Sequence, residues 1–512
     1  MSDRIFTSSM HLPTDLFEFL TCLFPGVQLK PRDVDDLAII LTKYGNPQEW
    51  SPSRKKLVLS LSCAATFVTT YTPGAYSAGL PQYQAEWDVN TIQVYLGLTL
   101  FTLLFALAPM FLASLSELSG RRPLFVAAGI VYVASQLGSG FTASFAGLLV
   151  TRALAGVSCS VFSTVVGGVI SDMHIASERN APMAIFTGAV FCGLGLGPLI
   201  SSVIAQNLDW RWIYHVQSIS CGTVVAGLYF FFPETRGDVI LSRRAKEIDM
   251  WCQRVDGRPE GERPSWVAQS DEQRATLTMI IITSLKRPIH LLFTESVVFW
   301  FSLWMSFAWS ILYVSFDAVP LIFTDAYNFS SQESGFVFAA VVVASIIGTF
   351  AAIWQGTVVE NPESWIYRYV VRGSPEARLL FSCAQSLLLP LGLFWLGTTA
   401  RPSIPWIVPA LSVGVLTLGI FSVYLAVFNY LADVYHMYSS SAIAAQSFSR
   451  NLFAALLPLA IQPLLNSSLS ILGTGSFLGG IALLIGVVPW VLVAAGSGIR
   501  ARSKIASEIA LG

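Results

Sequence analysis

The stretch Ser116-Glu117-Leu118-Ser119-Gly120-Arg121-Arg122 is a short charged turn between two long apolar runs. These runs, residues 93–113 and 123–141, are each long enough to cross a bilayer as a helix, which needs about 20 residues at a rise of about 1.5 Å per residue. Arg pairs beside spanning helices stay on the cytoplasmic side. The turn therefore predicts a helical hairpin in a membrane with its loop in the cytoplasm.

The composition supports a membrane protein of helices. The 512 residues are 54% hydrophobic and 12% charged, and the mean hydropathy is +0.62, whereas soluble domains carry about a quarter charged residues. The net charge of −1 indicates no particular partner. The seven Cys fall in predicted spans or on the predicted cytoplasmic side, so we expect no disulfide framework. The start of the chain has no signal-peptide pattern, so we expect the first span to target the protein.

Twelve apolar stretches follow one another, six on each side of a polar segment. They are residues 57–79, 93–113, 123–141, 145–171, 182–206 and 212–232, then 288–316, 332–356, 378–398, 405–430, 439–463 and 476–496. We therefore predict a cytoplasmic N-terminal segment (1–56), a six-helix bundle (57–232), a cytoplasmic linker (233–287), a second six-helix bundle (288–496) and a cytoplasmic tail (497–512). Two pseudo-symmetric halves of this kind are typical of transporters with a site near the midplane.

The distribution of Lys and Arg orients these spans. With the N-terminus in the cytoplasm, most of the 30 Lys and Arg fall on the cytoplasmic side, as the positive-inside rule requires. The sequons at Asn328 and Asn466 then both lie in outer loops, which makes these two residues candidates for glycosylation.

Three further patterns accompany the charged turn. Span 4 carries Arg152 with Gly156 one turn later, span 5 carries Gly193-x-Gly195-x-Gly197-Pro198, and Asp209-Trp210-Arg211-Trp212 leads into a span that ends at Pro233-Glu234-Thr235-Arg236. In this order the patterns resemble the major facilitator superfamily over about residues 50–500. More narrowly, they are similar to the fungal twelve-span drug:proton antiporters, which include multidrug, polyamine and secondary-metabolite toxin exporters.

The chain departs from that pattern in three places. Ala113 and Ser114 stand where the usual loop starts with small residues including Gly, and Ser119 stands where the fungal group commonly has an aromatic residue. Ser201-Ser202 replaces the usual Gly pair after Gly197-Pro198. These departures leave the fold expectation intact and leave the substrate open.

The resemblance implies a secondary transporter that exports a small amphipathic organic compound by proton antiport with alternating access. We expect a monomer in the fungal plasma membrane rather than the vacuole, because no clear sorting signal is readable in the sequence. A polyamine exporter, a nutrient uptake carrier and a passive uniporter of the same fold remain alternatives. The sequence has no nucleotide-binding loop, metal-ligand cluster or nucleophile–base pair. We therefore expect no enzyme, cofactor, metal or nucleic-acid partner, and only substrate, protons and lipid as partners.

The charged turn is a candidate conformational latch. Glu117 and Arg121 could contact the loop between spans 4 and 5 around Glu178 and Arg179, or Asp172 at the end of span 4. Such contacts would have to break when the cavity opens inward. The alternative is that Arg121 and Arg122 only fix the topology. The candidate latch residues are Glu117, Gly120, Arg121, Arg122, Asp172 and Arg179.

Buried charges are candidates for proton coupling. An Arg at membrane depth costs at least about 2.5–3.5 kcal/mol, so Arg152 should face the interior. It either holds helices together or, as the resemblance implies, favours the ionised form of a nearby carboxyl group. Arg450 in span 11 has the same two interpretations. The candidate carboxyl groups are Glu295, near the inner end of span 7, Asp317 at its outer mouth and Asp433 at the inner end of span 10. Glu295 could equally be an interfacial residue, and Asp317 a solvated one.

Small and aromatic residues complete the candidate sites. Gly193, Gly197 and Pro198 permit close helix contacts, and the family associates this segment with antiport. Aromatic residues of span 7 are candidate substrate walls, or else helix-packing residues. The substrate-cavity candidates are Tyr71, Gln217, Trp300, Trp304, Tyr424, Asn429 and Gln446.

Overall fold

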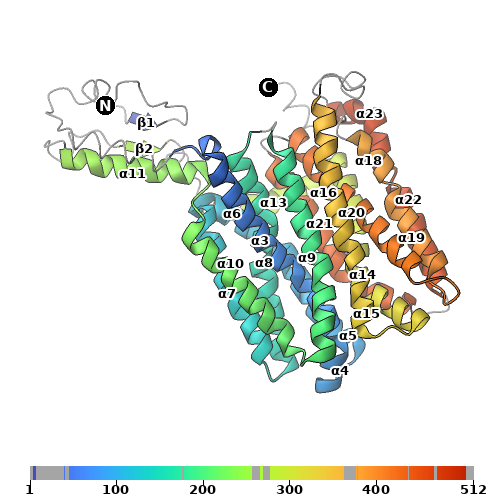
Figure 1. Cartoon of the computed structure of the whole chain (residues 1–512). Helices are drawn as coiled ribbons and strands as arrows, with labels where there is room; N and C mark the ends of the chain where they lie inside the picture. The colour runs from blue at the N-terminus through green and yellow to red at the C-terminus, as the bar shows by residue number, and fades with distance from the viewer. Residues whose placement is uncertain are drawn as a thin grey trace.

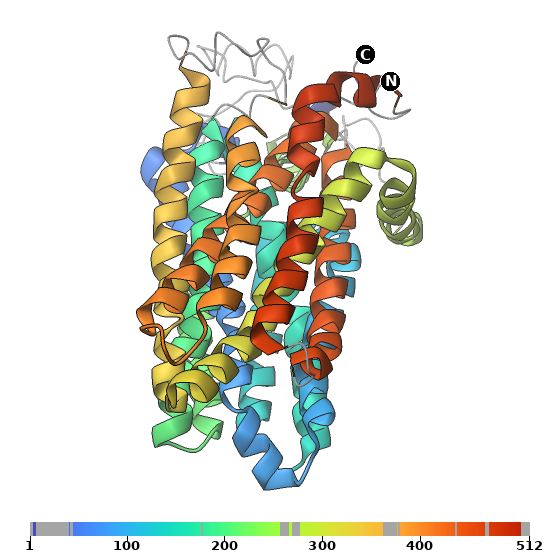
Figure 2. The same ribbon diagram turned by 90° about the vertical axis from the view of Figure 1, so that its right-hand side faces the viewer.

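The structure is a computed structural model that describes residues 4–6, 40, 45–175, 178–255, 266–268, 277–361, 376, 379–435, 438–465 and 470–502. Long helices form two neighbouring bundles, one blue to green and one yellow to red (Figures 1 and 2). We call the end of the bundles that carries the 116–122 turn the inner end, since the sequence predicts that it faces the cytoplasm.

The first bundle contains six spans. They are α3 (Pro52–Ala78), α5 (Thr91–Leu107) with α6 (Pro109–Ser119), α7 (Arg121–Phe141), α8 (Phe145–Met173), α9 (Asn180–Asn207) and α10 (Arg211–Phe231). A short outer helix, α4 (Leu80–Trp87), connects α3 to α5. The helices α5 and α6 meet at a bend of 44°. The bend lies at Pro109, the first residue of α6, because proline interrupts the helical hydrogen-bond ladder.

The second bundle has the same number of spans. They are α14 (Ser296–Tyr327), α15 (Ser331–Phe336) with α16 (Ala339–Glu360), α18 (Leu379–Gln385) with α19 (Leu388–Thr399), α20 (Ile407–Tyr435), α21 (Ser439–Leu465), and α22 (Ser470–Ile485) with α23 (Val488–Arg502). In the described residues, eight helices are long and apolar enough to cross a membrane alone, or nine if α5 and α6 count as one span. Three further spans, α3, α10 and α21, have 27, 21 and 27 residues. Buried polar side chains, such as Thr66, Gln217 and Gln446, make these three less apolar. The predicted fold class is confirmed.

The segment between the bundles contains α11 (Gly237–Val255), β2 (Trp266–Ala268) and α13 (Leu277–Thr294). The helix α11 lies flat beside the inner end of the first bundle (Figure 1). The strand β2 pairs in parallel with β1 (Arg4–Phe6). This two-stranded pair is the exception to an otherwise helical chain within the described residues.

Span 7 lies further along the chain than the sequence predicted. The apolar run suggested 288–316, but the backbone is extended at Glu295, with φ −100° and ψ 108°, and α14 begins at Ser296 and continues to Tyr327. Residues 288–294 belong instead to α13, which precedes the span. The prediction was wrong because α13 ends in an apolar sequence that runs into α14 without a polar gap. As a result, Asp317 lies inside the helix and not in a loop at its mouth.

The two bundles contact each other at both ends. At the outer end, the Gln332 backbone N–H donates to Gln206 Oε1 at 2.7 Å, and Asn207 Nδ2 donates to Gln332 Oε1 at 3.3 Å. At the inner end, Asn180 Nδ2 donates to the Ala352 carbonyl at 3.4 Å, and the Ser114 and Ser284 hydroxyls form a hydrogen bond between α6 and α13.

Candidate functional site

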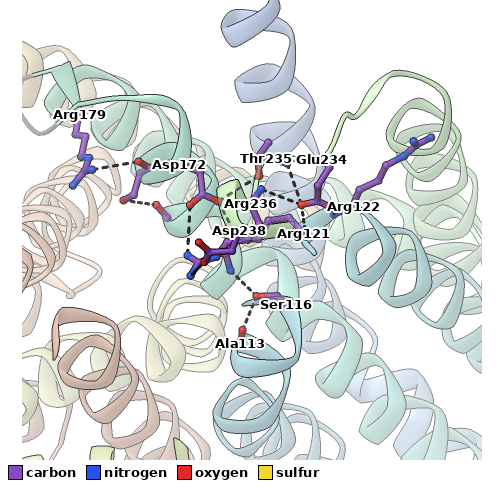
Figure 3. A network of polar contacts seen from close by, with 12 residues as sticks. Ala113, Ser116, Arg121, Arg122, Asp172, Arg179, Glu234, Thr235, Arg236 and Asp238 are labelled. Carbon is purple, nitrogen blue, oxygen red and sulfur yellow. Dashed lines mark hydrogen bonds and ion pairs between the residues drawn. The ribbon is translucent and has the colours of Figure 1, made fainter. Parts of the chain in front are cut away.

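The inner turn holds the Glu234 carboxylate against the first residues of α7 (Figure 3). The Arg121 backbone N–H donates to Glu234 Oε1 at 2.8 Å, and the Arg122 N–H donates to Oε2 at 3.3 Å. A helix N-terminus has unpaired N–H groups and a partial positive charge, so an acid is stabilised there. Gly120 precedes them with φ 101°, in the region that favours glycine.

Arg121 connects this turn to span 4. Its Nε donates to Asp172 Oδ2 at 3.2 Å, and its Nη1 donates to Ser116 Oγ at 2.5 Å. In the Arg121–Asp172 ion pair, Arg121 is buried and the Asp172 side chain is 12% exposed. Arg236 Nη1 lies 3.9 Å from Asp172 Oδ1, and Arg236 Nη2 lies 2.8 Å from Asp238 Oδ2. One network of charges therefore joins the inner ends of α7 and α8 to the start of α11 (Figure 3).

The structure brings together four of the six candidate latch residues: Gly120, Arg121, Arg122 and Asp172. Arg122 Nη2 donates to the Tyr229 carbonyl at 2.8 Å.

Two candidates lie outside this network. Glu117 is exposed and has no hydrogen bond or ion pair in the described part of the chain. Arg179 binds the end of α8, because its Nε donates to the His174 carbonyl at 2.9 Å and its Nη2 to the Ser171 carbonyl at 3.2 Å. Glu234 belongs to the sequence motif Pro233-Glu234-Thr235-Arg236, but the motif alone does not indicate that this acid is the partner of the turn.

Arg152 lies in the interior of the first bundle. Its side chain is fully buried, and its guanidinium carbon lies 4.5 Å from the ring centroids of both Tyr76 and Phe101. Its Nε donates to the Gly97 carbonyl at 3.4 Å. Nη1 and Nη2 have no hydrogen-bond partner among the described residues. Cation–π contacts therefore provide much of the stabilisation of this charge.

Asp317 approaches the same region from the second bundle. Its Oδ1 is buried, and so is the Ser77 Oγ that faces it from α3; neither has a hydrogen-bond partner within the described residues. Tyr76, the residue before Ser77, contributes the ring against which Arg152 lies. A carboxyl group of α14 and a guanidinium group of α8 therefore approach neighbouring residues of α3. The interpretation of Asp317 as a solvated residue was wrong, because α14 continues for two to three turns beyond it.

Glu295 lies at the break between α13 and α14. It is buried, 3% exposed, and the Tyr435 hydroxyl donates to its Oε2 at 3.2 Å. Its carboxyl group is therefore held between α14 and α20 and does not reach out to the interface.

Aromatic rings from both bundles meet near the middle of the molecule. Phe191 of α9 lies 5.7 Å from Trp309, 5.3 Å from Phe421 and 5.9 Å from Tyr424, measured between ring centroids. Tyr424 also stacks on Phe428 at 4.6 Å. We call these five residues the central cage. Since Phe191 belongs to the first bundle and the other four to the second, the cage must open when the bundles separate.

Arg450 lies against the central cage. Its guanidinium carbon is 4.5 Å from the Trp309 ring centroid and 5.2 Å from that of Tyr424. Gln446 is one turn earlier on the same face of α21, and both side chains are buried. Of the substrate-cavity candidates, the structure places Tyr424 in the cage and Gln446 beside it.

The two Trp candidates of span 7 lie elsewhere. Trp304 is buried but stacks on Phe301, with centroids 6.1 Å apart, and Phe301 contacts Tyr430, so Trp304 packs inside the second bundle. Trp300 is 51% exposed on the surface of the bundle. It precedes Trp309 by about 2.5 helical turns, which puts the two on opposite faces of α14. Trp309 is the residue of this helix that reaches the cage, and correct span boundaries would have identified it.

The remaining cavity candidates are polar groups on other helices. Tyr71 and Ser201 share a hydrogen bond of 2.8 Å between α3 and α9. Gln217 is buried in α10, and its Nε2 donates to the Ile213 carbonyl at 3.2 Å. Asn429 lines a cavity of about 190 Å³ between α9, α16, α18 and α20, together with Asn180, Gln355, Gln385 and Phe421. Because Phe421 also belongs to the central cage, this cavity adjoins the cage on its inner side.

Glycines bring α3 and α9 into close contact. A Cβ atom on Gly193 would lie 2.5 Å from the Phe67 carbonyl oxygen, and one on Gly197 would lie 3.2 Å from the Ala75 backbone nitrogen. Pro198 Cδ in turn fills the space where a Cβ of Gly74 would be. The predicted segment Gly193, Gly197 and Pro198 is therefore the contact surface between spans 1 and 5.

Asn328, a glycosylation candidate, is exposed at the outer end of α14 in a left-handed conformation, with φ 54°. Asn466 lies outside the described residues. Glycosylation of both stays a prediction.

Comparison with known proteins gives concordant results. Residues 62–458 match the family description "Major Facilitator Superfamily". The chain is 30% identical to the "Major facilitator superfamily multidrug transporter mdrA" of Aspergillus fumigatus, over 90% of this chain and 74% of that protein. It is 30% identical to "Efflux pump FUB11" of Gibberella moniliformis, covering 90% and 75% of the two chains. It is also 28% identical to "Multidrug transporter FLR2" of Candida glabrata, covering 94% and 81%.

A solved structure shares the fold. The proton:xylose symporter XylE superposes with a TM-score of 0.62 at 14% identity, covering 87% of this chain and 97% of that one.

Proposed function

Because the chain belongs to the major facilitator superfamily and is thus a multi-pass membrane transporter and not an enzyme, we propose that it exports a small amphipathic organic compound in exchange for protons. The central cage is the observation that carries this proposal. Five aromatic rings from both bundles meet there, and rings of this kind bind flat, largely apolar molecules. The relatives named as multidrug transporters and efflux pumps support the same direction of transport.

Alternating access follows from the two-bundle arrangement. Phe191 must leave Trp309 and Tyr424 when the bundles separate, so the cage can open to one side at a time. The Arg121–Asp172–Glu234 network would hold the inner ends of α7, α8 and α10 as one unit while the bundle moves. In this proposal the network is a latch within one bundle, and the inner hydrogen bond of Asn180 to the Ala352 carbonyl is the contact that must break between the bundles.

We assign the proton to Asp317. The Oδ1 atom of Asp317 is buried, and the neutral hydroxyl of Ser77 is the polar group that faces it; an ionised carboxylate is disfavoured in such surroundings, whereas a protonated one is tolerated. Asp317 lies where α14 and α3 close the outer half of the molecule, so separation of these helices would expose it to the outside. Proton binding from outside would then permit closure over Asp317. Arg152, whose guanidinium lies against the Tyr76 ring, is the second residue of the proposed coupling site.

The alternatives fit less well. A polyamine exporter would need carboxylates around a polycation, yet among the described residues the central cage carries a buried Arg450 and no acid. A nutrient carrier is disfavoured by the named efflux relatives, and a passive uniporter would have no use for a buried Asp317. The plasma membrane is the proposed location, and the monomer the proposed functional unit.

Proteoliposomes with an imposed pH gradient test the coupling. An amphipathic aromatic dye should accumulate against its gradient in wild-type vesicles and in those with Asp325→Asn, an exposed residue of the same helix. Asp317→Asn should still move the dye, but only to equilibrium. Gradient-driven accumulation by Asp317→Asn would remove Asp317 from the mechanism, and wild-type transport that ignores the pH gradient would overturn antiport altogether.

A further inference from the structure

Buried hydrogen-bond donors gather beside the central cage. They are Arg450 Nε and Nη1, Gln446 Nε2 and Trp309 Nε1, and none has a partner in the part of the chain that the structure describes. All three side chains are at least nine-tenths buried, with exposures of 1%, 0% and 4%. A buried donor without an acceptor is costly, and a buried cation without a counter-ion more so. The arrangement is thus complete only when an acceptor is present.

The acceptor must be an anion. All four groups are donors, and the one acceptor of Gln446, Oε1, already faces the Ser447 hydroxyl at 3.5 Å. None of the ion pairs found among the described residues includes Arg450. An Arg fork matches a planar group with two oxygens, and such charge-assisted pairs are the strong hydrogen bonds. A carboxylate supplies both oxygens and the charge.

The geometry points to the rest of the ligand as well. We propose that Arg450, Gln446 and Trp309 bind the carboxylate of an organic-acid substrate whose aromatic or apolar body lies against Phe191, Phe421 and Tyr424. This inference rests on the proposed function and narrows its substrate class to organic anions. Arg152, another buried Arg, differs because both of its rings come from the first bundle and its Nε is already bonded to the Gly97 carbonyl.

An anionic substrate also fits exchange for protons. An anion that leaves the cell and a proton that enters both move in the direction favoured by a membrane potential that is negative inside. Each exchange would then be driven by the membrane potential acting on two charges, the anion and the proton, in addition to the pH gradient.

A matched pair of ligands tests the charge requirement. Full-length protein in nanodiscs is titrated at pH 7 with 1-naphthoate and with neutral 1-naphthamide, which has the same ring and nearly the same shape. The wild type should prefer the carboxylate by about tenfold or more, the order expected for one charge-assisted pair. Arg450→Gln should remove the preference, and Arg450→Lys, which keeps the charge without the fork, should retain part of it.

The controls separate the site from a general positive potential. Arg152→Gln should keep the preference for the carboxylate. Trp309→Phe keeps the ring and removes one donor, so it should lower the preference but not the binding of the amide; Gln446→Leu should do the same. If Arg450→Gln does not fold, the preference for the carboxylate is tested with Trp309→Phe and Gln446→Leu alone. Equal binding of both ligands by the wild type, an undiminished preference in Arg450→Gln, or its loss in Arg152→Gln would each overturn the proposal.

A transport assay distinguishes failure of the anion-site proposal from failure of the proposed export function. A wild type that exports the amide as well as the acid is an exporter without an anion site. A wild type that prefers the carboxylate in binding but moves it only inward has the anion site and is not an exporter.

Discussion

Gly120 and Glu234 fit together because Gly120 has no side chain: a Cβ atom there would overlap the Glu234 carboxylate. The left-handed conformation at Gly120 and the acid that pairs with the next two N–H groups thus depend on each other. The turn is a binding site for a carboxylate of the same chain, and the glycine is required twice, for its conformation and for its size.

We expect Gly120→Ala to destabilise the protein by about 1–3 kcal/mol, because the backbone is strained for a non-glycine residue and Glu234 is displaced. Thermal unfolding of the purified protein measures this, and transport should fall with it. Gly222→Ala is the matched control, since a Cβ at this position meets nothing within 4 Å. Equal melting temperatures for the two variants would contradict the proposed fit.

Arg121→Ala should lower both stability and transport. It leaves Asp172 with the more distant Arg236 and the Thr235 hydroxyl, and the loss of stability should approach the cost of removing one partner from a buried pair, about 3–5 kcal/mol. The charged turn is therefore a larger contributor to stability than an exposed loop would be. Glu117→Ala, in the same turn but exposed, should change the free energy of unfolding by no more than about 0.5 kcal/mol. The prediction fails if Glu117→Ala proves the more harmful substitution.

Trp309→Ala should change which compounds are transported when variants are compared at equal amounts of folded protein. Aromatic substrates would lose a stacking surface worth about 0.5–1.5 kcal/mol, or up to roughly tenfold in affinity. Export assays over a panel of aromatic and aliphatic compounds measure the effect. Trp300→Ala, on the opposite face of α14, should leave the panel unchanged. A uniform loss of all substrates would indicate that Trp309 serves packing alone.

The outer contact of Glu86 with Arg211 should make stability depend on pH. Hydrogen bonds from Arg211 hold the pKa of Glu86 below its ordinary value. The contact therefore stabilises the protein above the pKa of unfolded Glu, about 4.3, and this contribution is lost as the pH falls through the lower folded value. Glu86→Gln should lower the melting temperature at pH 7 and match the wild type in strong acid. Asp88→Asn, an exposed neighbour, is the control; a difference that persists in acid would exclude the ionic origin.

Sequence patterns predicted the bundle and its order because apolar length and Arg position act locally. The Gly120 turn, the Arg152 span and the glycines of span 5 could all be identified without neighbours. The sequence patterns did not predict which residues from distant parts of the chain contact these motifs. Glu234 follows the turn by more than a hundred residues, and its role depends on how α10 returns to the inner end of α7.

The errors in span 7 have a single physical origin. Apolar residues occur both in α13 and in α14, and hydropathy alone does not register the extended backbone at Glu295 that separates them. The shift moved Trp300 and Trp304 into the middle of the expected span and Asp317 to its mouth. Both the choice of Trp and the interpretation of Asp317 followed from this displacement.

The bend at Pro109 gives span 2 two separate attachments. On its outer side, α5 packs on α21 of the second bundle, where Thr99 Oγ1 donates to the Ala455 carbonyl at 3.1 Å. On its inner side, α6 contacts α13, in the segment between the bundles, through Ser114 and Ser284. A straight helix would transmit any tilt from one attachment to the other, whereas the bend at Pro109 allows α6 to tilt while α5 stays in place. Because α6 can move while α5 remains packed on α21, the molecule can open toward the cytoplasm without separating the contacts on its outer side.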